Sequence, residues 1–111
     1  MADPLDNGGN VLYTGQVVIL QTEVFRDWLN GLRDRAVRIK IDDRLMRLAR
    51  GHAGDTKSVG DGVRELRVHF GPGYRVYYTR RGQTIVLLLC GGDKSTQDKD
   101  IRRAIQIAAK W

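Results

Sequence analysis

The sequence predicts an α+β domain in which an antiparallel sheet packs against an N-terminal helical hairpin and is followed by a C-terminal helix. Two observations predict this class. Apolar residues recur every three or four positions between residues 23 and 50, whereas they alternate with polar ones between Gly-rich turns from residue 55 to residue 90. The expected order of elements is β-α-α-β-β-β-β-α, and 111 residues suffice for one such domain.

The first elements follow a stretch without periodicity. Residues 1–15 combine Pro, Asp, Asn and Gly, so we expect a flexible N-terminal tail there and the folded domain over residues 16–111. The run "QVVILQ" is β-branched and predicts a short strand. Thr22 is a good N-cap for a helix over residues 23–32, which has an apolar stripe.

A second helix is expected directly after the first. Asp34 can cap it, and apolar residues recur along residues 35–50 at spacings of four, four and three until Gly51 ends it. The link between the two helices is short, which predicts an antiparallel hairpin.

Beyond Gly51 the hydrophobic period changes from helical to alternating. Four strands are expected, separated by Gly-rich turns: "DTKSV", "VRELRVHF", "GYRVYYT" and "TIVLLLC". Residues 85–89 are apolar at every position, which predicts a central strand covered on both faces. Ser95 or Thr96 then caps a last helix whose apolar stripe includes Ile101 and Ala104.

Composition indicates a polyanionic partner. The formal net charge is +6 at pH 7, from 19 Lys and Arg against 13 Asp and Glu, and Arg outnumbers Lys. RNA, DNA, anionic lipid and an acidic protein all fit this charge. The single cysteine, Cys90, has no partner for an internal disulfide, so we expect a cytoplasmic protein. No apolar run approaches the roughly 18 residues of a membrane helix, and we expect no membrane association.

One face of the expected sheet carries the residues that fit chemistry on RNA. Strand alternation places Arg67, His69, Arg75 and Tyr77 together, on the side away from the helical hairpin. Arg67 and Arg75 are candidate stabilisers of charge on a phosphate, while His69 and Tyr77 are candidate general acid and base. Alternatively, His69 is an ordinary surface residue and Tyr77 a packing partner.

Three further cations are candidate phosphate ligands. Lys94 in "GGDKST" is expected beside the N-terminus of the last helix, where free N–H groups favour an anion. Lys57, on the short strand after the second helix, and Arg80, in the expected turn "RRGQ", complete the set. The alternative at Lys94 is a simple strand-to-helix turn, and the P-loop spacing is missing. No Cys/His cluster or metal spacing occurs, so we expect neither a metal nor another cofactor.

A family resemblance rests on two stretches, "ELRVHFGPGYRVYY" and "LLCGGDKSTQDKDI". Together with "FRDWLNGLRDRAVRIKIDDRL" they resemble the addiction-module killer proteins of the RelE/ParE toxin superfamily, in its HigB-like branch, over residues 17–109. The resemblance implies a compact RelE-like fold and the toxin of a type II toxin–antitoxin pair, neutralised by a cognate antitoxin protein. Many relatives are endoribonucleases that cut mRNA in the ribosomal A site.

The resemblance also implies roles for individual residues. Arg75 in "GYRVYY" matches a functional position of the family, and Lys94 and Lys57 match two others more loosely. Several active relatives carry an additional Arg, Tyr or His near the C-terminus. At that end this sequence has Arg102, Arg103, Lys110 and Trp111, so the general acid and base are not assigned by the resemblance.

Three functions share this expected fold, because a fold does not settle a function. The first is a metal-independent, ribosome-dependent mRNA interferase that inhibits translation. The second is a DNA gyrase poison of the ParE type, which acts by protein binding and needs no Arg, His and Tyr cluster on the sheet. The third is a non-catalytic RNA-binding module. In each case we expect an acidic antitoxin and, with it, a possible higher-order complex.

Overall fold

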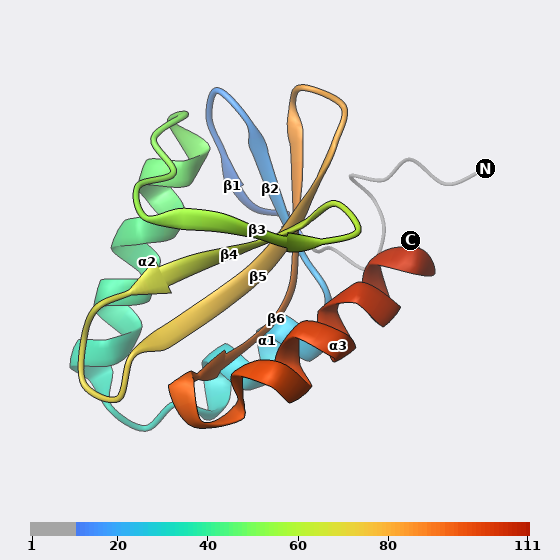
Figure 1. Cartoon of the computed structure of the whole chain (residues 1–111). Helices are drawn as coiled ribbons and strands as arrows, with labels where there is room; N and C mark the ends of the chain where they lie inside the picture. The colour runs from blue at the N-terminus through green and yellow to red at the C-terminus, as the bar shows by residue number, and fades with distance from the viewer. Residues whose placement is uncertain (1–10) are drawn as a thin grey trace.

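A six-stranded sheet forms the middle layer of the computed structural model, which describes residues 11–111 (Figure 1). The strand order is β1-β2-β6-β5-β4-β3. The strands are β1 (Val11–Thr14), β2 (Val18–Gln21), β3 (Thr56–Gly60), β4 (Val63–Val68), β5 (Tyr74–Arg81) and β6 (Ile85–Asp93). The helices are α1 (Glu23–Gly31), α2 (Arg35–Ala49) and α3 (Gln97–Ala109), with a short 3-10 turn, η2 (Lys94–Thr96), before α3. The predicted α+β class is confirmed.

The two N-terminal helices begin at their predicted caps. The Thr22 hydroxyl oxygen accepts a hydrogen bond from the Phe25 N–H at 3.0 Å, and the Asp34 carboxylate accepts one from the Ala36 N–H at 2.9 Å. Gly51 follows α2 with a φ of +87°, in the left-handed region that favours glycine. These local signals suffice because a cap satisfies backbone groups of the turn that it starts.

The prediction of a loose tail over residues 1–15 is wrong at its C-terminal end. Val11–Thr14 form β1, which pairs antiparallel with β2, and residues 1–10 lie outside the described residues. The Tyr13 hydroxyl donates to Asp42 of α2 at 3.2 Å. Gly15 makes the turn possible, because a Cβ there would lie 2.6 Å from the Ala49 carbonyl oxygen. A four-residue strand is too short to display a period, so composition alone indicated a tail.

The sheet is mixed, whereas the sequence predicted an antiparallel one. β3, β4, β5 and β6 form the expected antiparallel meander, but β2 pairs with β6 in parallel, with Val18 opposite Ile85. Parallel neighbours need a long crossover connection, and here α1, α2 and three strands lie between the two strands. No hairpin turn therefore sets their relative direction, and the turn signals in the sequence carry no information about it.

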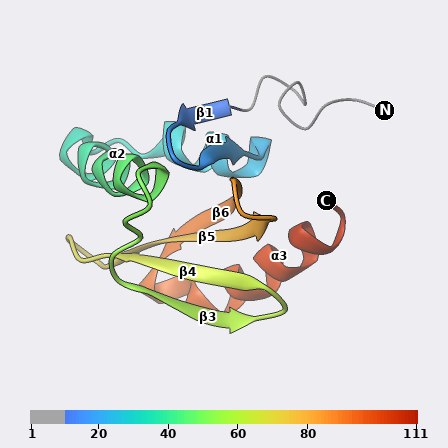
Figure 2. The same ribbon diagram turned by 90° about the horizontal axis from the view of Figure 1, so that it is seen from above.

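Helices cover both faces of the sheet (Figure 2). Val86 and Leu88 of β6 pack in the core on the side of α1 and α2, whereas Leu87 and Leu89 pack in the core beneath α3. The prediction that residues 85–89 form a central strand covered on both faces is confirmed. Within residues 11–111, none of the helices has the length and apolar character needed to cross a membrane.

Two glycines at the end of β6 allow helices to approach both faces. A Cβ at Gly91 would collide with the Trp28 ring of α1, and a Cβ at Gly92 would collide with the Asp100 carboxylate of α3. Both glycines lie inside the strand and neither has a positive φ. Their role is therefore to allow close packing of α1 and α3 on the two faces of the strand.

Candidate functional site

A buried carboxylate lies at the centre of the residues that the sequence singled out. Glu65 of β4 is fully buried. Its Oε1 accepts from Arg67 Nε at 3.0 Å, and its Oε2 accepts from the Tyr77 hydroxyl at 3.1 Å and from Gln97 Nε2 at 2.8 Å. Arg75 Nε lies 3.6 Å from the same Oε2. We call these five residues the Glu65 network; the sequence analysis assigned no role to Glu65.

Strand register explains why these side chains meet. Glu65 is opposite Tyr77, and Arg67 is opposite Arg75, on the neighbouring antiparallel strands β4 and β5. Residues two apart on a strand share a face, so all four side chains project to the same side of the sheet. Gln97, the first residue of α3, reaches the network from above that face.

Electrostatics keep the network ionised. Burial alone would raise the pKa of Glu65, but the hydrogen bonds from Arg67, Gln97 and Tyr77, together with the charge of Arg75, bring it below its ordinary value. Burial raises the pKa of Tyr77 well above its usual range, and the charge of Glu65 raises it further. Tyr77 therefore remains a protonated donor to a charged carboxylate.

Tyr77 does not lie on an open face, and that part of the prediction is wrong. Its side chain is fully buried in the core beneath α3. Strand alternation gave the correct side of the sheet, but α3 covers this side. The apolar stripe of α3, which includes Ile101 and Ala104, was the sequence signal that this helix needs an apolar surface. In this arrangement Tyr77 orients Glu65 and does not reach the surface.

The two arginines remain partly accessible. The side chain of Arg67 is 30% exposed and that of Arg75 is 12% exposed. Arg75 Nη1 donates to the Gly73 carbonyl at 2.8 Å, while its buried Nε has no hydrogen-bond partner among the described residues. Two guanidinium groups thus lie at directly opposed positions with one carboxylate between them, which leaves a net positive charge.

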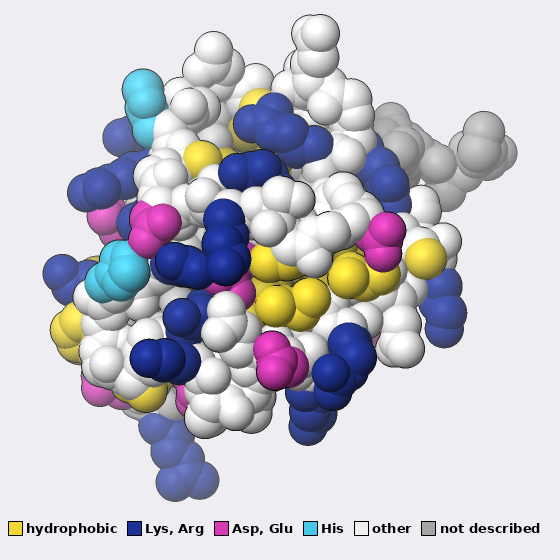
Figure 3. Space-filling model, in the orientation of Figure 1, with side chains coloured by type: hydrophobic (Ala, Val, Ile, Leu, Met, Phe, Trp, Pro, Cys, Tyr) yellow, Lys and Arg dark blue, Asp and Glu magenta, His cyan; other side chains and the backbone are white. Residues whose placement is uncertain are grey.

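Of the three further cations that the sequence predicted to bind phosphate, two lie near Arg67 and Arg75. Lys57 of β3 is exposed, with its Cα opposite Glu65, and Lys94 is exposed in η2, beside the Gly73 turn that Arg75 contacts. We call Lys57, Arg67, Arg75 and Lys94 the basic surface. Figure 3 shows Lys and Arg side chains gathered on the left half of this face, next to an apolar strip along α3.

Arg80 is not part of the basic surface. It is opposite Val86, whose side chain belongs to the core on the side of α1 and α2, so Arg80 projects to the other face of the sheet. Its Nη1 lies 3.5 Å from the Gln83 carbonyl in the next turn.

The start of the last helix is already occupied by an acidic side chain. Asp93 Oδ1 accepts from the Ser95 N–H at 2.8 Å and from the Ser95 hydroxyl at 2.5 Å. These bonds lower the pKa of Asp93 below its ordinary value. Thr96 stands at the N-cap position of α3 but makes no side-chain cap bond. In the turn before α3, the Ser95 N–H beside Lys94 is therefore already satisfied by Asp93 and is not available to an anion.

His69 lies one residue beyond the end of β4 and is separate from the Glu65 network. Its Nε2 lies 2.5 Å from Asp55 Oδ2, and its side chain is 72% exposed. Strand alternation predicted that His69 lies on the same face as Arg67. The structure adds its contact with Asp55, which no pattern in the sequence indicated. His69 is accessible to solvent, unlike Tyr77.

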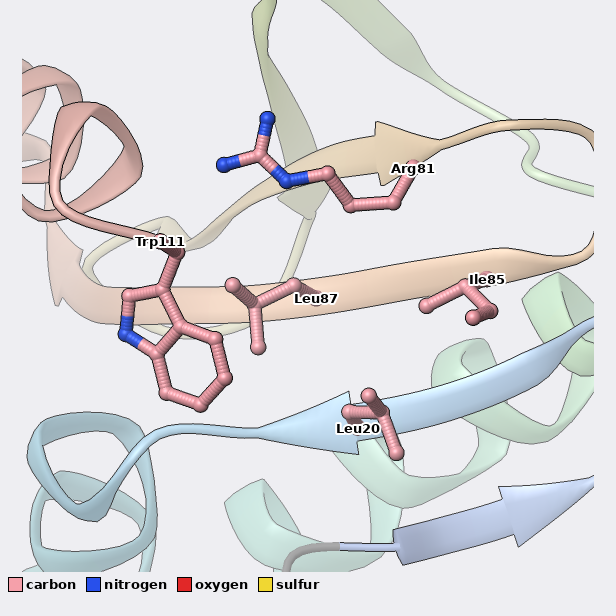
Figure 4. A pocket seen from close by; sticks show the side chains of 5 residues that line it. All are labelled: Leu20, Arg81, Ile85, Leu87 and Trp111. Atoms are coloured by element: carbon pink, nitrogen blue, oxygen red, sulfur yellow. The ribbon is translucent and has the colours of Figure 1, made fainter. Parts of the chain in front are cut away.

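An apolar pocket lies elsewhere on the molecule and shares no residue with the basic surface (Figure 4). Its volume is about 240 Å³, and it is lined by Leu20, Arg81, Ile85, Leu87 and Trp111. The Arg81 guanidinium donates to the Ala108 carbonyl at 2.8 Å, near the end of α3. Its predominantly apolar walls do not suit a phosphate, so the basic surface is the better candidate for binding a polyanion.

Comparisons with known proteins identify the family. Residues 27–111 match the family described as phage-derived protein Gp49-like (DUF891), and this range contains the Glu65 network, Asp55 and His69. An uncharacterized protein of Haemophilus influenzae is 49% identical over 92 residues, which cover 83% of this chain and 93% of that protein. No solved structure matches the chain significantly. The chain therefore belongs to the phage-derived Gp49-like family.

Proposed function

We propose that the protein is the toxin of a type II toxin–antitoxin pair, with a RelE-like fold of the HigB-like branch, and that it cuts mRNA on the ribosome. Membership of the Gp49-like family supports a toxin-like protein. The residues that resemble addiction-module killer proteins fall largely inside the range that the family match covers. The helical hairpin, the meander and the C-terminal helix agree with the fold that this resemblance implies.

One observation carries the enzymatic part of the proposal. Arg67 and Arg75 are opposed across two strands, and the buried carboxylate of Glu65 forms a hydrogen bond with Arg67 and an ion-pair contact of 3.6 Å with Arg75. Phosphoryl chemistry without a metal requires preorganised cations where negative charge develops on phosphorus. Arginine suits this role because its planar fork of donors matches phosphate oxygens, and Lys57 and Lys94 extend the positive surface along the RNA backbone.

The proposal includes a cytoplasmic location, mRNA and the ribosome as partners, and a cognate antitoxin. A chain with a net charge of +6 and an exposed basic surface attracts an acidic protein. An acidic antitoxin that covers Arg67 and Lys57 would block access of RNA to them, and several copies of each protein can then join in a higher-order complex.

The test is to map mRNA 5′ ends in a reconstituted translation reaction, with and without ribosomes. We expect new ends at codon positions that require ribosomes and disappear with Arg75→Ala. Arg38→Ala, which removes an exposed arginine of α2 outside the basic surface, is the matched control and should cut like the wild type. Intact messages with the wild-type protein, or cutting unaffected by Arg75→Ala, would refute the enzymatic assignment.

A gyrase poison of the ParE type is the second candidate, and the burial of Tyr77 favours it. If the Glu65 network only ties α3 to the sheet, its arginines have a structural role and no catalysis is needed. This candidate predicts growth arrest with DNA damage and trapped gyrase while messages stay intact. A non-catalytic RNA-binding module would instead give RNA binding that weakens steeply with salt and no cleavage product.

A further inference from the structure

Asp55 and His69 form a pair beside the basic surface. Asp55 Oδ2 and His69 Nε2 are 2.5 Å apart, and their side chains are 45% and 72% exposed. The two residues are fourteen positions apart in the chain, so their contact depends on the position of the loop between α2 and β3 relative to the end of β4. An exposed imidazole that makes one directed contact is accessible to a ligand on its other nitrogen.

The fold holds Asp55 in this place through Arg44 of α2. The Arg44 guanidinium donates to the Ala53 carbonyl at 2.9 Å and also to the Arg67 carbonyl. Gly54 has a φ of +72°, and a Cβ there would lie 2.7 Å from Arg44 Nη2. The approach of the guanidinium to the chain thus requires glycine at this position. Arg44 thereby fixes the loop that leads to β3 against the end of β4.

A backbone hydrogen bond is a second constraint on the position of Asp55. The Arg67 N–H donates to the Asp55 carbonyl at 2.9 Å. Asp55 is therefore tied at its backbone to the residue whose guanidinium belongs to the basic surface. Asp55 also links the pair to the basic surface through charge, because its carboxylate interacts with the Arg67 guanidinium as well as with His69.

The charge on Asp55 selects one form of the imidazole. The hydrogen bond from His69 lowers the pKa of Asp55, burial opposes this, and the charges of His69, Arg67 and Arg44 add to the lowering. A carboxylate accepts only, so Nε2 carries the proton that it donates to Asp55. In the neutral imidazole, Nδ1 is then free to accept a proton.

We propose that His69 is the general base of the nuclease and that Asp55 is the residue that positions it. This inference rests on the proposed function. His69 Nδ1 takes the proton of the ribose 2′-hydroxyl, the 2′-oxygen forms a bond to phosphorus, and the bond from phosphorus to the 5′-oxygen breaks. The products are a 2′,3′-cyclic phosphate and a 5′-hydroxyl, whose oxygen takes its proton from water. Arg67 and Arg75 stabilise the charge on the phosphate during this step.

The role of Asp55 differs from a purely structural one in its effect on the tautomer of His69. The Asp55 carboxylate accepts from Nε2, so its removal takes away the acceptor that keeps the proton on this nitrogen. Among the described residues, Arg67 and Arg44 are the other charged groups that act on Asp55. A loss of the preferred tautomer at unchanged stability is a result that a change in packing alone would not give.

The experiment measures single-turnover cleavage of a ribosome-bound message between about pH 5.5 and pH 8, a window that spans the usual titration of histidine. A positioned base contributes typically 10²–10⁴-fold, so we expect a loss of about 100-fold for His69→Gln and about tenfold for Asp55→Asn. Asp27→Asn, which removes an exposed carboxylate on α1, is the matched control and should leave rate and profile unchanged.

The outcomes separate this inference from the function on which it rests. If the wild type cleaves RNA and Asp55→Asn cleaves it at the same rate, the proposed role of the Asp55–His69 pair is refuted while the nuclease function stands. No cleavage by the wild type would overturn both. Imidazole ¹⁵N spectra of the free protein give a readout that needs no activity: we expect the Nε2–H form in the wild type and its loss in Asp55→Ala. A mixture of forms in the wild type would contradict the geometry.

Discussion

Two carboxylates on one side of the molecule have opposite surroundings. Glu65 is fully buried and receives hydrogen bonds from three side chains, whereas Asp55 is half exposed and contacts one imidazole. Removing one partner of a buried pair leaves the other unsatisfied, while an exposed ion pair adds little to stability. The comparison teaches that the first cluster ties the sheet to α3, whereas the second can be changed at little cost to the fold.

The largest effect that tests this contrast is expected from Glu65→Ala. The substitution leaves the buried Tyr77 hydroxyl without its acceptor and removes the carboxylate that faces Arg75, so we expect a loss of about 3–5 kcal/mol in the free energy of unfolding, the usual cost of breaking a buried pair. Denaturant unfolding measures it, with Asp27→Ala as the exposed control. A loss no larger than that of the control would mean that the network does not hold the fold.

The pH dependence of stability sharpens the same point. The pKa of Glu65 is lower in the folded state, so its contribution is present above the unfolded value near 4.5 and is lost as pH falls through the folded value. The difference in unfolding free energy between the wild type and Glu65→Gln should therefore be constant near neutrality and shrink below about pH 4.5. A difference that does not change with acidification would contradict the assignment of an ionised Glu65.

The contact of α3 with the sheet is tested by Gly92→Ala. The added methyl group collides with Asp100, so α3 must shift, and we expect a cost of about 1–3 kcal/mol, typical of overpacking. Because Gln97 begins the same helix, the shift should also expose Tyr77 to iodination or to fluorescence quenching. Gly82→Ala, at a turn with open space, is a comparison for backbone strain alone.

A smaller effect is expected from Gln97→Ala. It removes one hydrogen bond to Glu65 at the edge of the network, and the expected loss is about 1 kcal/mol. Thermal unfolding is sensitive enough to detect it. Loss of the complete stabilisation attributed to Glu65 would show that α3, and not the arginines, is the main partner of the carboxylate.

The smallest effect on stability is expected from Asp55→Asn. The side chains of Asp55 and His69 are both exposed, and exposed ion pairs add little to stability. The unfolding midpoint should match that of the wild type, even where cleavage is slowed. A marked decrease in the midpoint would place Asp55 with Glu65 among the residues that hold the fold together.

The sequence predicted the parts of this molecule that depend on local signals. The caps at Thr22 and Asp34 and the central strand over residues 85–89 follow from hydrogen bonding and periodicity within a few residues. The parallel pairing of β2 with β6 joins segments far apart in the chain, and no turn or period encodes it.

The sequence predicted on which side of the sheet the candidate site lies, but not how deeply its residues are buried. Alternation placed Arg67, Arg75 and Tyr77 on one face because the period of a strand is two. It gave no information about which face α3 covers, so Tyr77 was expected at the surface. Asp55 was missed because its contact with His69 depends on Arg44, which comes from a helix and binds two carbonyls that no sequence pattern marks.

The parallel pairing of β2 with β6 also orders the events of folding. The Thr22 hydroxyl at the end of β2 donates to the Leu89 carbonyl, across 67 residues of chain. Pairing at such separation closes a large loop, which slows folding. During synthesis, β2 and the helical hairpin leave the ribosome long before β6, the strand that joins them to the rest of the sheet. The helix α1, which packs mainly against β6, is therefore made early but buried late, and the nascent chain exposes its apolar stripe until β6 is complete.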